Sequence, residues 1–193
     1  MIKFFVVVSL LTEVAQAQSY EEKSIIRAAT EIGVPAPLLR AICYSESRLQ
    51  RTAYAHGDGG KLGSAFGMCQ ILYGTATTMG VTDERCKESF VDKPKDYKVC
   101  KLFGPYTNAK IAARLLKLLL RRYDNNYVNA VAAYNSGIPK TCPRRGYFHI
   151  QVFDKKNNKM KKRRRKCVAG GLLNQDYVDR VLKFMVKESK KPI

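Results

Sequence analysis

Residues 37–47 read Pro-Leu-Leu-Arg-Ala-Ile-Cys-Tyr-Ser-Glu-Ser, and this stretch decides the fold. Proline is tolerated in the first turn of a helix, so a helix opening at Pro37 is predicted. Its three- and four-residue spacing gives Glu46 the same face as three apolar residues, Leu39, Ile42 and Cys43. A carboxylate at the end of an apolar face is either satisfied by local donors or held with a raised pKa, which a general acid needs near neutral pH. The alternative is a helix-end glutamate that points into solvent.

Working outward, capping residues and apolar periodicity predict that most of the chain is helical. Residues 48–66 form a Gly-rich loop between helices. The first expected helix is capped by Ser19 and stopped by Gly33 after about Ile32, and a short helix follows over about 67–79. A long helix is capped by Thr107 or Asn108 and has an apolar stripe of Ile111, Leu115, Leu116, Leu119 and Leu120. The last two helices run from Asn126 to Ser136, stopped by Gly137, and from a cap at Asn174 to about Lys187.

Two further segments carry polar groups in apolar surroundings. Residues 63–71 read Gly-Ser-Ala-Phe-Gly-Met-Cys-Gln-Ile, and the glycines permit a close approach of the backbone to a ligand. Gln70 needs specific partners there, because a buried amide is costly without them. Residues 130–137 read Ala-Val-Ala-Ala-Tyr-Asn-Ser-Gly, with Tyr134 and Asn135 as the sizeable polar groups. Taken singly, these segments are typical of a helix start with a buried glutamine and of a helix end.

Taken together and in order, the motifs resemble those of the lytic transglycosylases, a family of peptidoglycan-cleaving enzymes. The resemblance covers about residues 20–138 and 172–186. It implies a mostly α, lysozyme-like helical domain, of the type shared by goose-type lysozymes and lytic transglycosylases. The matching motifs are Glu46-Ser47, Gly67-Met68-Cys69-Gln70, Ala133-Tyr134-Asn135-Ser136-Gly137, Tyr177-Val178 and the entry to the long helix, Leu102-Phe103-Gly104-Pro105-Tyr106-Thr107-Asn108.

The resemblance also implies a reaction and a site. Glu46 would act as the sole acid and base, cutting the bond between N-acetylmuramic acid and N-acetylglucosamine to leave 1,6-anhydro ends. No metal or cofactor is implied, and we expect a monomer acting on glycan strands. Cys69 stands where the family has methionine, which implies a smaller wall of the sugar pocket. The residues expected to position Glu46 and the substrate are Ser47, Ser64, Gln70, Tyr134, Asn135 and Tyr177.

A hydrolase of the goose-type lysozyme class is the alternative within enzymes. Asp58, in the Gly-rich loop, is where such an enzyme could hold a carboxylate that assists a water molecule. The other interpretation of Asp58 is an ordinary turn residue beside glycine.

The charge is concentrated in an insertion at about residues 139–170. The chain carries 35 Lys and Arg against 16 Asp and Glu, a net charge of +19, and residues 139–167 hold twelve basic residues and one acid. Residues 147–153 are aromatic and β-branched, so a β-hairpin is predicted. We expect this hairpin to bind anionic envelope polymers through a wall-targeting patch, Lys161, Lys162, Arg163, Arg164, Arg165 and Lys166.

Three other interpretations of the hairpin stay open: a solvated charge run, disruption of an anionic outer membrane, and nucleic-acid binding. The last would make the chain a binding protein that reuses the fold. Export argues against nucleic acid as the partner, although a virion protein would be an exception.

The N-terminus and the cysteines both predict export. Residues 1–17 have a positive start, an apolar stretch and Ala15-Gln16-Ala17, as in a cleaved signal peptide. Residues 18–193 would then be a single lytic transglycosylase domain in the periplasm, outside the cell or on a virion, with no transmembrane anchor and a role in a secretion machine or a phage. Six cysteines in an exported chain fit a disulfide framework, whose pairing the sequence leaves open. Cys86–Cys100 and Cys142–Cys167 are the favoured pairs, because each would close a loop at its base, and Cys43 and Cys69 would be either bridged or buried thiols.

Overall fold

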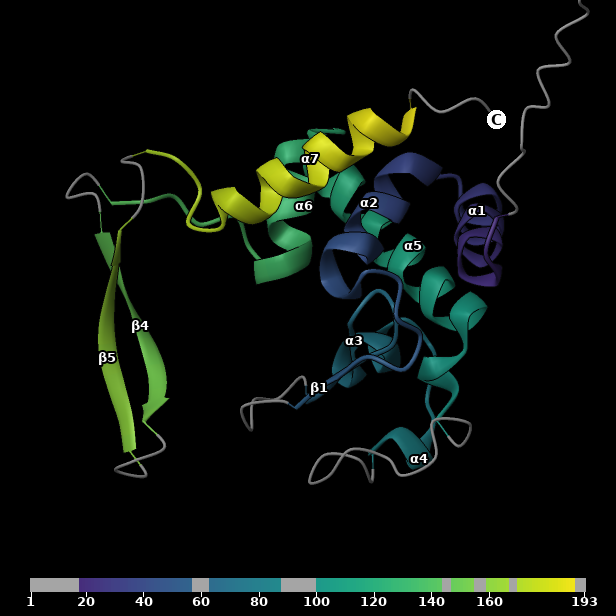
Figure 1. Cartoon of the computed structure of the whole chain (residues 1–193), viewed down its shortest axis with the longest axis horizontal. Coiled ribbons are helices and arrows are strands. Elements are labelled where there is room, and N and C mark those ends of the chain that lie inside the picture. The colour runs from purple at the N-terminus through teal and green to yellow at the C-terminus, as the bar shows by residue number, and fades with distance from the viewer. Residues whose placement is uncertain are drawn as a thin grey trace, which may run out of the picture.

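Helix α5 (Pro105–Arg122) runs through the middle of a helical body and carries much of its core. Ile111, Ala112 and Leu116 on this helix are fully or almost fully buried. The computed structural model describes residues 18–56, 63–87, 100–143, 147–154, 159–166 and 170–189. Figure 1 shows several of the other helices packed against α5, with one hairpin standing to the side. The predicted class, a mostly helical domain with an inserted hairpin, is confirmed.

Helices α1 (Tyr20–Ile32) and α2 (Ala36–Ser47) begin and end close to the predicted positions. Ser19 forms a reciprocal cap, in which its hydroxyl accepts from the Glu22 amide at 3.2 Å and its own amide donates to the Glu22 carboxylate at 3.1 Å. Gly33 ends α1 with a left-handed φ of 73°, as expected for a glycine stop. Helix α2 starts one residue before Pro37 and ends at Ser47, and the next residue, Arg48, is also left-handed.

The segment between α2 and α5 is less helical than predicted. Strands β1 (Tyr54–Ala55), β2 (Ala65–Phe66) and β3 (Ile71–Leu72) form an antiparallel sheet in the order β1-β2-β3. The expected helix over 67–79 is wrong in its first half, because residues 67–70 form a turn in which Gly67 and Gln70 have positive φ. Short helices follow: α3 (Tyr73–Thr78), α4 (Glu84–Lys87) and the 3₁₀ helix η2 (Lys101–Phe103).

Asn108 is a buried connector and not the expected helix cap. Helix α5 begins three residues earlier, at Pro105, after Gly104. The Asn108 side chain is fully buried. Its oxygen accepts from the Cys69 amide, and its nitrogen donates to the carbonyls of Phe66 and Leu102, each at 2.8 Å. These hydrogen bonds fix the turn at 67–70 to the start of α5. They replace the hydrogen bonds to water that the same groups lose when they are buried.

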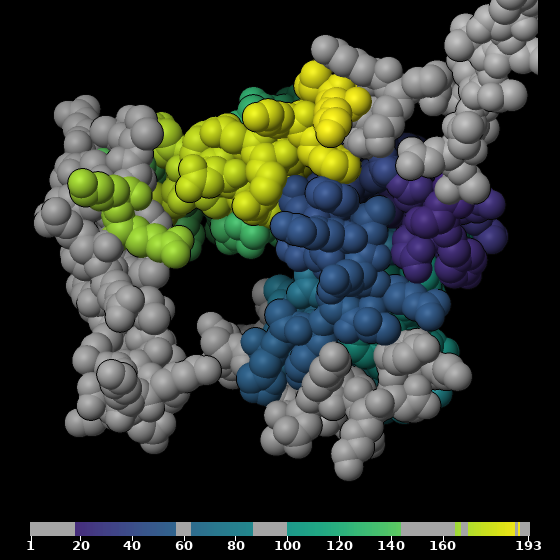
Figure 2. Space-filling view, viewed as in Figure 1, coloured from purple at the N-terminus to yellow at the C-terminus, as the bar shows by residue number. Residues whose placement is uncertain are grey.

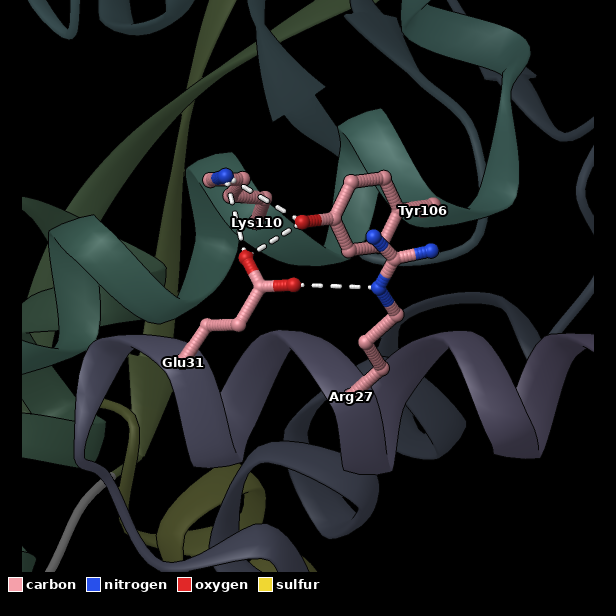
Figure 3. A network of polar contacts seen from close by, with 4 residues as sticks. All are labelled: Arg27, Glu31, Tyr106 and Lys110. Atoms are coloured by element: carbon pink, nitrogen blue, oxygen red, sulfur yellow. Dashed lines mark hydrogen bonds and ion pairs between the residues drawn. The ribbon is translucent and has the colours of Figure 1, made fainter.

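A polar network joins α1 to α5 on the outer surface (Figure 3). The Glu31 carboxylate accepts from the Tyr106 hydroxyl, from Lys110 Nζ at 3.0 Å and from Arg27 Nε at 3.0 Å. These donors, in the order Tyr106, Lys110 and Arg27, lower the pKa of Glu31 to about 2. The Arg27 guanidinium also lies 4.3 Å from the centre of the Tyr106 ring. Glu31 is consequently ionised at neutral pH and orients α1 on α5.

Two complete disulfides are described. The predicted Cys86–Cys100 bond is confirmed. Cys43 and Cys69, which the sequence left as either bridged or free, are bonded to each other and join α2 to the 67–70 turn. Cys142 is also disulfide-bonded, whereas its predicted partner, Cys167, lies outside the described residues.

Helices α6 (Tyr127–Ser136) and α7 (Gln175–Ser189) flank the insertion. Between them, β4 (Tyr147–Asp154) and β5 (Lys159–Lys166) pair in antiparallel register, which confirms the hairpin. Its base is clipped by backbone hydrogen bonds from the Cys142 amide to the Gly171 carbonyl at 2.6 Å and from the Leu173 amide to the Lys140 carbonyl at 2.8 Å. The chain therefore leaves α6 and re-enters α7 at one place.

Among the described helices, none combines the length and the apolar character that crossing a membrane requires. The expected signal peptide, residues 1–17, lies outside the described residues.

Replacing Gly67 by alanine tests how much the fold depends on the turn at 67–70. A Cβ there would lie 2.5 Å from Asn108 Nδ2 and 2.6 Å from the Leu102 carbonyl oxygen, and φ is +73°. Gly67→Ala should lower the free energy of unfolding by about 3 kcal/mol, from backbone strain plus overpacking. The control Gly80→Ala has a similar φ of +81° but open space, so it should cost only about 1 kcal/mol. Urea unfolding measures both, and equal losses would disprove the steric account.

Candidate active site

Glu46 lies on the last turn of α2 and contacts the first turn of α7. The Tyr177 hydroxyl donates a hydrogen bond of 2.6 Å to Glu46 Oε1. Burial raises the pKa of Glu46, while the Tyr177 hydrogen bond and the positive charge of Arg180 act in the opposite direction. The net shift is upward, so the environment favours the protonated acid that a proton donor requires. The interpretation of Glu46 as a solvent-facing glutamate is wrong.

Aromatic packing sets the register of α2 against α7. Tyr44 stacks on Phe184 with ring centres 4.2 Å apart and planes 13° from parallel. The guanidinium of Arg40 lies 5.8 Å from the centre of the same Phe184 ring. On α7, Phe184 lies two helical turns after Tyr177, whereas on α2 its partner Tyr44 lies before Glu46. The two helices therefore run antiparallel, and the stacking helps to bring the Tyr177 hydroxyl to Glu46.

Tyr134 approaches Glu46 from α6. Its hydroxyl donates to the Cys69 carbonyl oxygen at 3.0 Å. Burial, and next the negative charge of Glu46, raise the pKa of Tyr134 well above its ordinary value. Burial raises the pKa of Tyr177 in the same way, so both phenols remain hydrogen-bond donors. Tyr177 from α7 thus bonds Glu46 directly, and the charge of Glu46 also acts on Tyr134 from α6.

The 67–70 turn forms the other side of this cluster. The Ser47 hydroxyl donates to the Met68 carbonyl at 2.7 Å, and Gln70 Nε2 donates to the Gly67 carbonyl at 2.9 Å. The backbone at Gly67 lies close to Asn108 and Leu102 within the protein. Cys69 is fully buried in its disulfide, so it does not form the expected smaller wall of a sugar pocket.

Ser64 and Asn135 complete the expected set and lie in different surroundings. Ser64 is fully buried, and its hydroxyl lies 3.0 Å from that of Tyr54. Asn135 is exposed at the end of α6, where its Oδ1 accepts from Asn174 Nδ2 at 3.2 Å. The structure thus brings Tyr134 and Tyr177 to Glu46, ties Ser47 and Gln70 to the adjacent turn, buries Ser64 and leaves Asn135 at the surface.

The sequence analysis missed Arg180 on α7, and it gave Asn174, which precedes α7, only the role of a helix cap. The guanidinium carbon of Arg180 lies 5.7 Å from the centre of the Tyr177 ring. Asn174 donates to the Ala132 carbonyl at 2.9 Å as well as to Asn135, so it joins the ends of α6 and α7. The signal for Arg180 was present, since a residue three positions after Tyr177 shares its face of a helix.

The remaining expected site residues are Asp58 and the basic patch on the hairpin. Asp58 lies outside the described residues. For the basic patch, β5 gives the backbone of residues 161–166, and Arg165 and Lys166 are exposed. Within the described ranges, no three His, Cys, Asp or Glu side chains are grouped so that they could hold a metal ion.

The helices that carry this cluster pack against one another. In Figure 2 the C-terminal helix α7 lies against α6 and against α2. In the described part of the chain, the groups that shift the pKa of Glu46 are Tyr177 and Arg180, and neither is a carboxylate. The arrangement therefore offers one acid, oriented by a phenol, at the contact between α2 and α7.

Comparison with known proteins places this geometry in a family. The profile described as "Transglycosylase SLT domain" matches residues 23–147. An inactive mutant of the lytic transglycosylase Slt from Pseudomonas aeruginosa has a similar fold, with a TM-score of 0.52 and 18% identity over 87% of this chain and 24% of that chain.

Two structures of the 70 kDa soluble lytic transglycosylase also match, one from Escherichia coli and one described as a complex with bulgecin A. Their TM-scores are 0.41 and 0.42, each with 25% identity over 60% of this chain and 16% of the other. The chain thus spans a quarter or less of the solved structures that it matches. Because the family profile covers well over half of its residues, the chain belongs to the transglycosylase SLT domain family.

Proposed function

We propose that the protein is a lytic transglycosylase, which cleaves the β-1,4 bond between N-acetylmuramic acid and N-acetylglucosamine in peptidoglycan. The observation that carries the proposal is that half-buried Glu46 accepts a hydrogen bond of 2.6 Å from the Tyr177 hydroxyl, in a chain of the SLT family. Glu46 donates its proton to the glycosidic oxygen as the bond breaks. The acetamido group of the substrate stabilises the positive charge that develops at C1.

The second half of the reaction uses the same residue as a base. Glu46, now a carboxylate, removes the proton from the muramyl C6 hydroxyl, which attacks C1 and closes the 1,6-anhydro ring. Tyr177 and Arg180 both stabilise the ionised form that Glu46 takes between these two steps. Tyr134 and the 67–70 turn hold the walls of the site in place, because the Tyr134 hydroxyl bonds the Cys69 carbonyl.

A hydrolase is the alternative, with Asp58 assisting a water molecule. It would leave reducing ends, and it would use two carboxyl groups where the proposed reaction uses one.

Replacing Glu46 by glutamine tests the proposal. Glu46→Gln cannot exchange a proton, so cleavage should fall by about 100- to 10,000-fold. Glu21→Gln, a half-buried glutamate on α1, is the matched control and should keep full activity. Mass spectrometry of digested peptidoglycan should show 1,6-anhydromuramyl ends. Reducing ends alone would favour the hydrolase, and full activity of Glu46→Gln would remove Glu46 from the acid role.

The phenol of Tyr177 should set the pH dependence of cleavage. Its hydrogen bond favours ionised Glu46, so Tyr177→Phe should raise the pKa of Glu46 further. Since the protonated acid starts the reaction, activity falls as the pH rises through that pKa. The alkaline fall of kcat/KM should therefore move upward by about one pH unit in Tyr177→Phe.

The control for this test is Tyr44→Phe, which removes a hydroxyl from the same α2–α7 interface while keeping the ring that stacks on Phe184. Its pH profile should match that of the unmodified protein. An unshifted profile in Tyr177→Phe would contradict the assigned role of the hydrogen bond.

We further propose that the protein is exported after cleavage behind Ala17 and acts in the cell envelope, with the hairpin as its wall-targeting arm. The support is the row of basic residues on β5, of which Arg165 and Lys166 are exposed. A row of cations attracts the carboxylates and phosphates of envelope polymers at a range set by salt.

Neutralising the arm separates targeting from catalysis. With Lys161–Lys166 all replaced by glutamine, binding to insoluble peptidoglycan at low salt should fall at least about tenfold, while cleavage of soluble glycan fragments is kept. A double replacement on α7, Lys183→Gln with Lys187→Gln, is the charge control. Cosedimentation measures binding. Unchanged wall binding, together with a loss of salt-dependent DNA binding, would favour the nucleic-acid interpretation.

A further inference from the structure

Arg180 places a positive charge beside the catalytic acid. It is exposed on α7, one helical turn after Tyr177. Its guanidinium carbon lies 5.7 Å from the Tyr177 ring centre, and the hydroxyl of that ring is bonded to Glu46. The charge of Arg180 also acts on both Glu46 and Tyr177. Any substrate seated at Glu46 would therefore lie within reach of this guanidinium.

This guanidinium has no salt bridge within the described part of the chain. Other arginines there, such as Arg27 and Arg85, pair with carboxylates on nearby residues. The acidic neighbour of Arg180, Asp179, instead accepts a hydrogen bond from Gln175 Nε2 at 2.7 Å. The contact with the Tyr177 ring is to a neutral group, so it does not replace a salt bridge.

The chemistry of the guanidinium narrows the class of ligand. Its planar fork of N–H donors matches a carboxylate, which it can bind through two parallel hydrogen bonds. If the proposed function holds, the sugars of the glycan offer neutral hydroxyl and acetamido groups. The charged carboxylates belong to the peptide attached to the lactyl group of N-acetylmuramic acid, which is the sugar whose C1 bond is cut.

We propose that Arg180 binds a carboxylate of the stem peptide and so makes the enzyme prefer glycan whose peptides are present and ionised. This inference rests on the proposed function and names a part of its substrate. A role in tuning Glu46 alone explains Arg180 less well, because solvent screens the interaction of so exposed a charge with Glu46.

The test compares two substrates that differ only in peptide charge. One is a soluble glycan fragment with intact stem peptides, and the other is the same fragment with its carboxylates converted to neutral methylamides. Arg180→Gln should raise KM for the first by about three- to tenfold and leave KM for the second unaltered, whereas any fall in kcat that arises through Glu46 should be the same for both substrates. Lys183→Gln, one turn further along α7, is the control and should behave like the unmodified protein on both.

Each other outcome has a defined meaning. An equal rise of KM on both substrates would show that Arg180 does not recognise the peptide carboxylate, and would overturn the inference. No change on either substrate would overturn it too. A conservative replacement, Arg180→Lys, keeps the charge and should restore part of the affinity for the charged substrate only.

Binding without catalysis separates this inference from the proposed function. In a Glu46→Gln background, calorimetry should give weaker binding of the charged fragment when Arg180→Gln is added, and no difference for the methylamide. If the unmodified protein cleaves neither fragment, the proposed function fails. The binding comparison still decides whether Arg180 recognises the peptide carboxylate.

Discussion

The side-chain amide of Asn108 makes three buried hydrogen bonds to the main chain, and the geometry around Glu46 depends on them. They fix the 67–70 turn to α5, and the turn in turn receives the hydroxyls of Ser47 and Tyr134. An apolar side chain in place of Asn108 would strand several buried polar groups, each at a cost of about 1–3 kcal/mol. The same amide explains why Gly67 has no room for a side chain.

The acid itself depends on a balance between burial and polar contacts. Burial at the α2–α7 interface favours neutral Glu46, whereas Tyr177 and Arg180 favour its anion. A residue that must donate a proton and then accept one needs an environment in which both the protonated and the ionised forms are accessible. The stacking of Tyr44 on Phe184 maintains that environment from outside, since it fixes how α7 lies on α2.

Local chemistry in the sequence was sufficient for helix boundaries such as Ser19 and Gly33, for the hairpin and for the Cys86–Cys100 loop. The meeting of Glu46 with Tyr177, 131 positions away, followed only from the family resemblance. The role of Asn108 was missed because its partners lie 39 and 42 residues earlier in the chain, where no periodicity links them. Gln70 was placed on a helix because its left-handed backbone is uncommon outside glycine and asparagine.

The backbone clip between residues 140–142 and 171–173 has a consequence for protein engineering. The chain leaves the helical body and returns to it at one narrow neck. The positions of the ends of α6 and α7 therefore do not depend on the length of the segment between them. Loop-closure entropy grows only slowly with length, so an inserted segment of another size adds little cost. The neck is thus a natural grafting point, where a different binding module could be attached without disturbing α6 and α7.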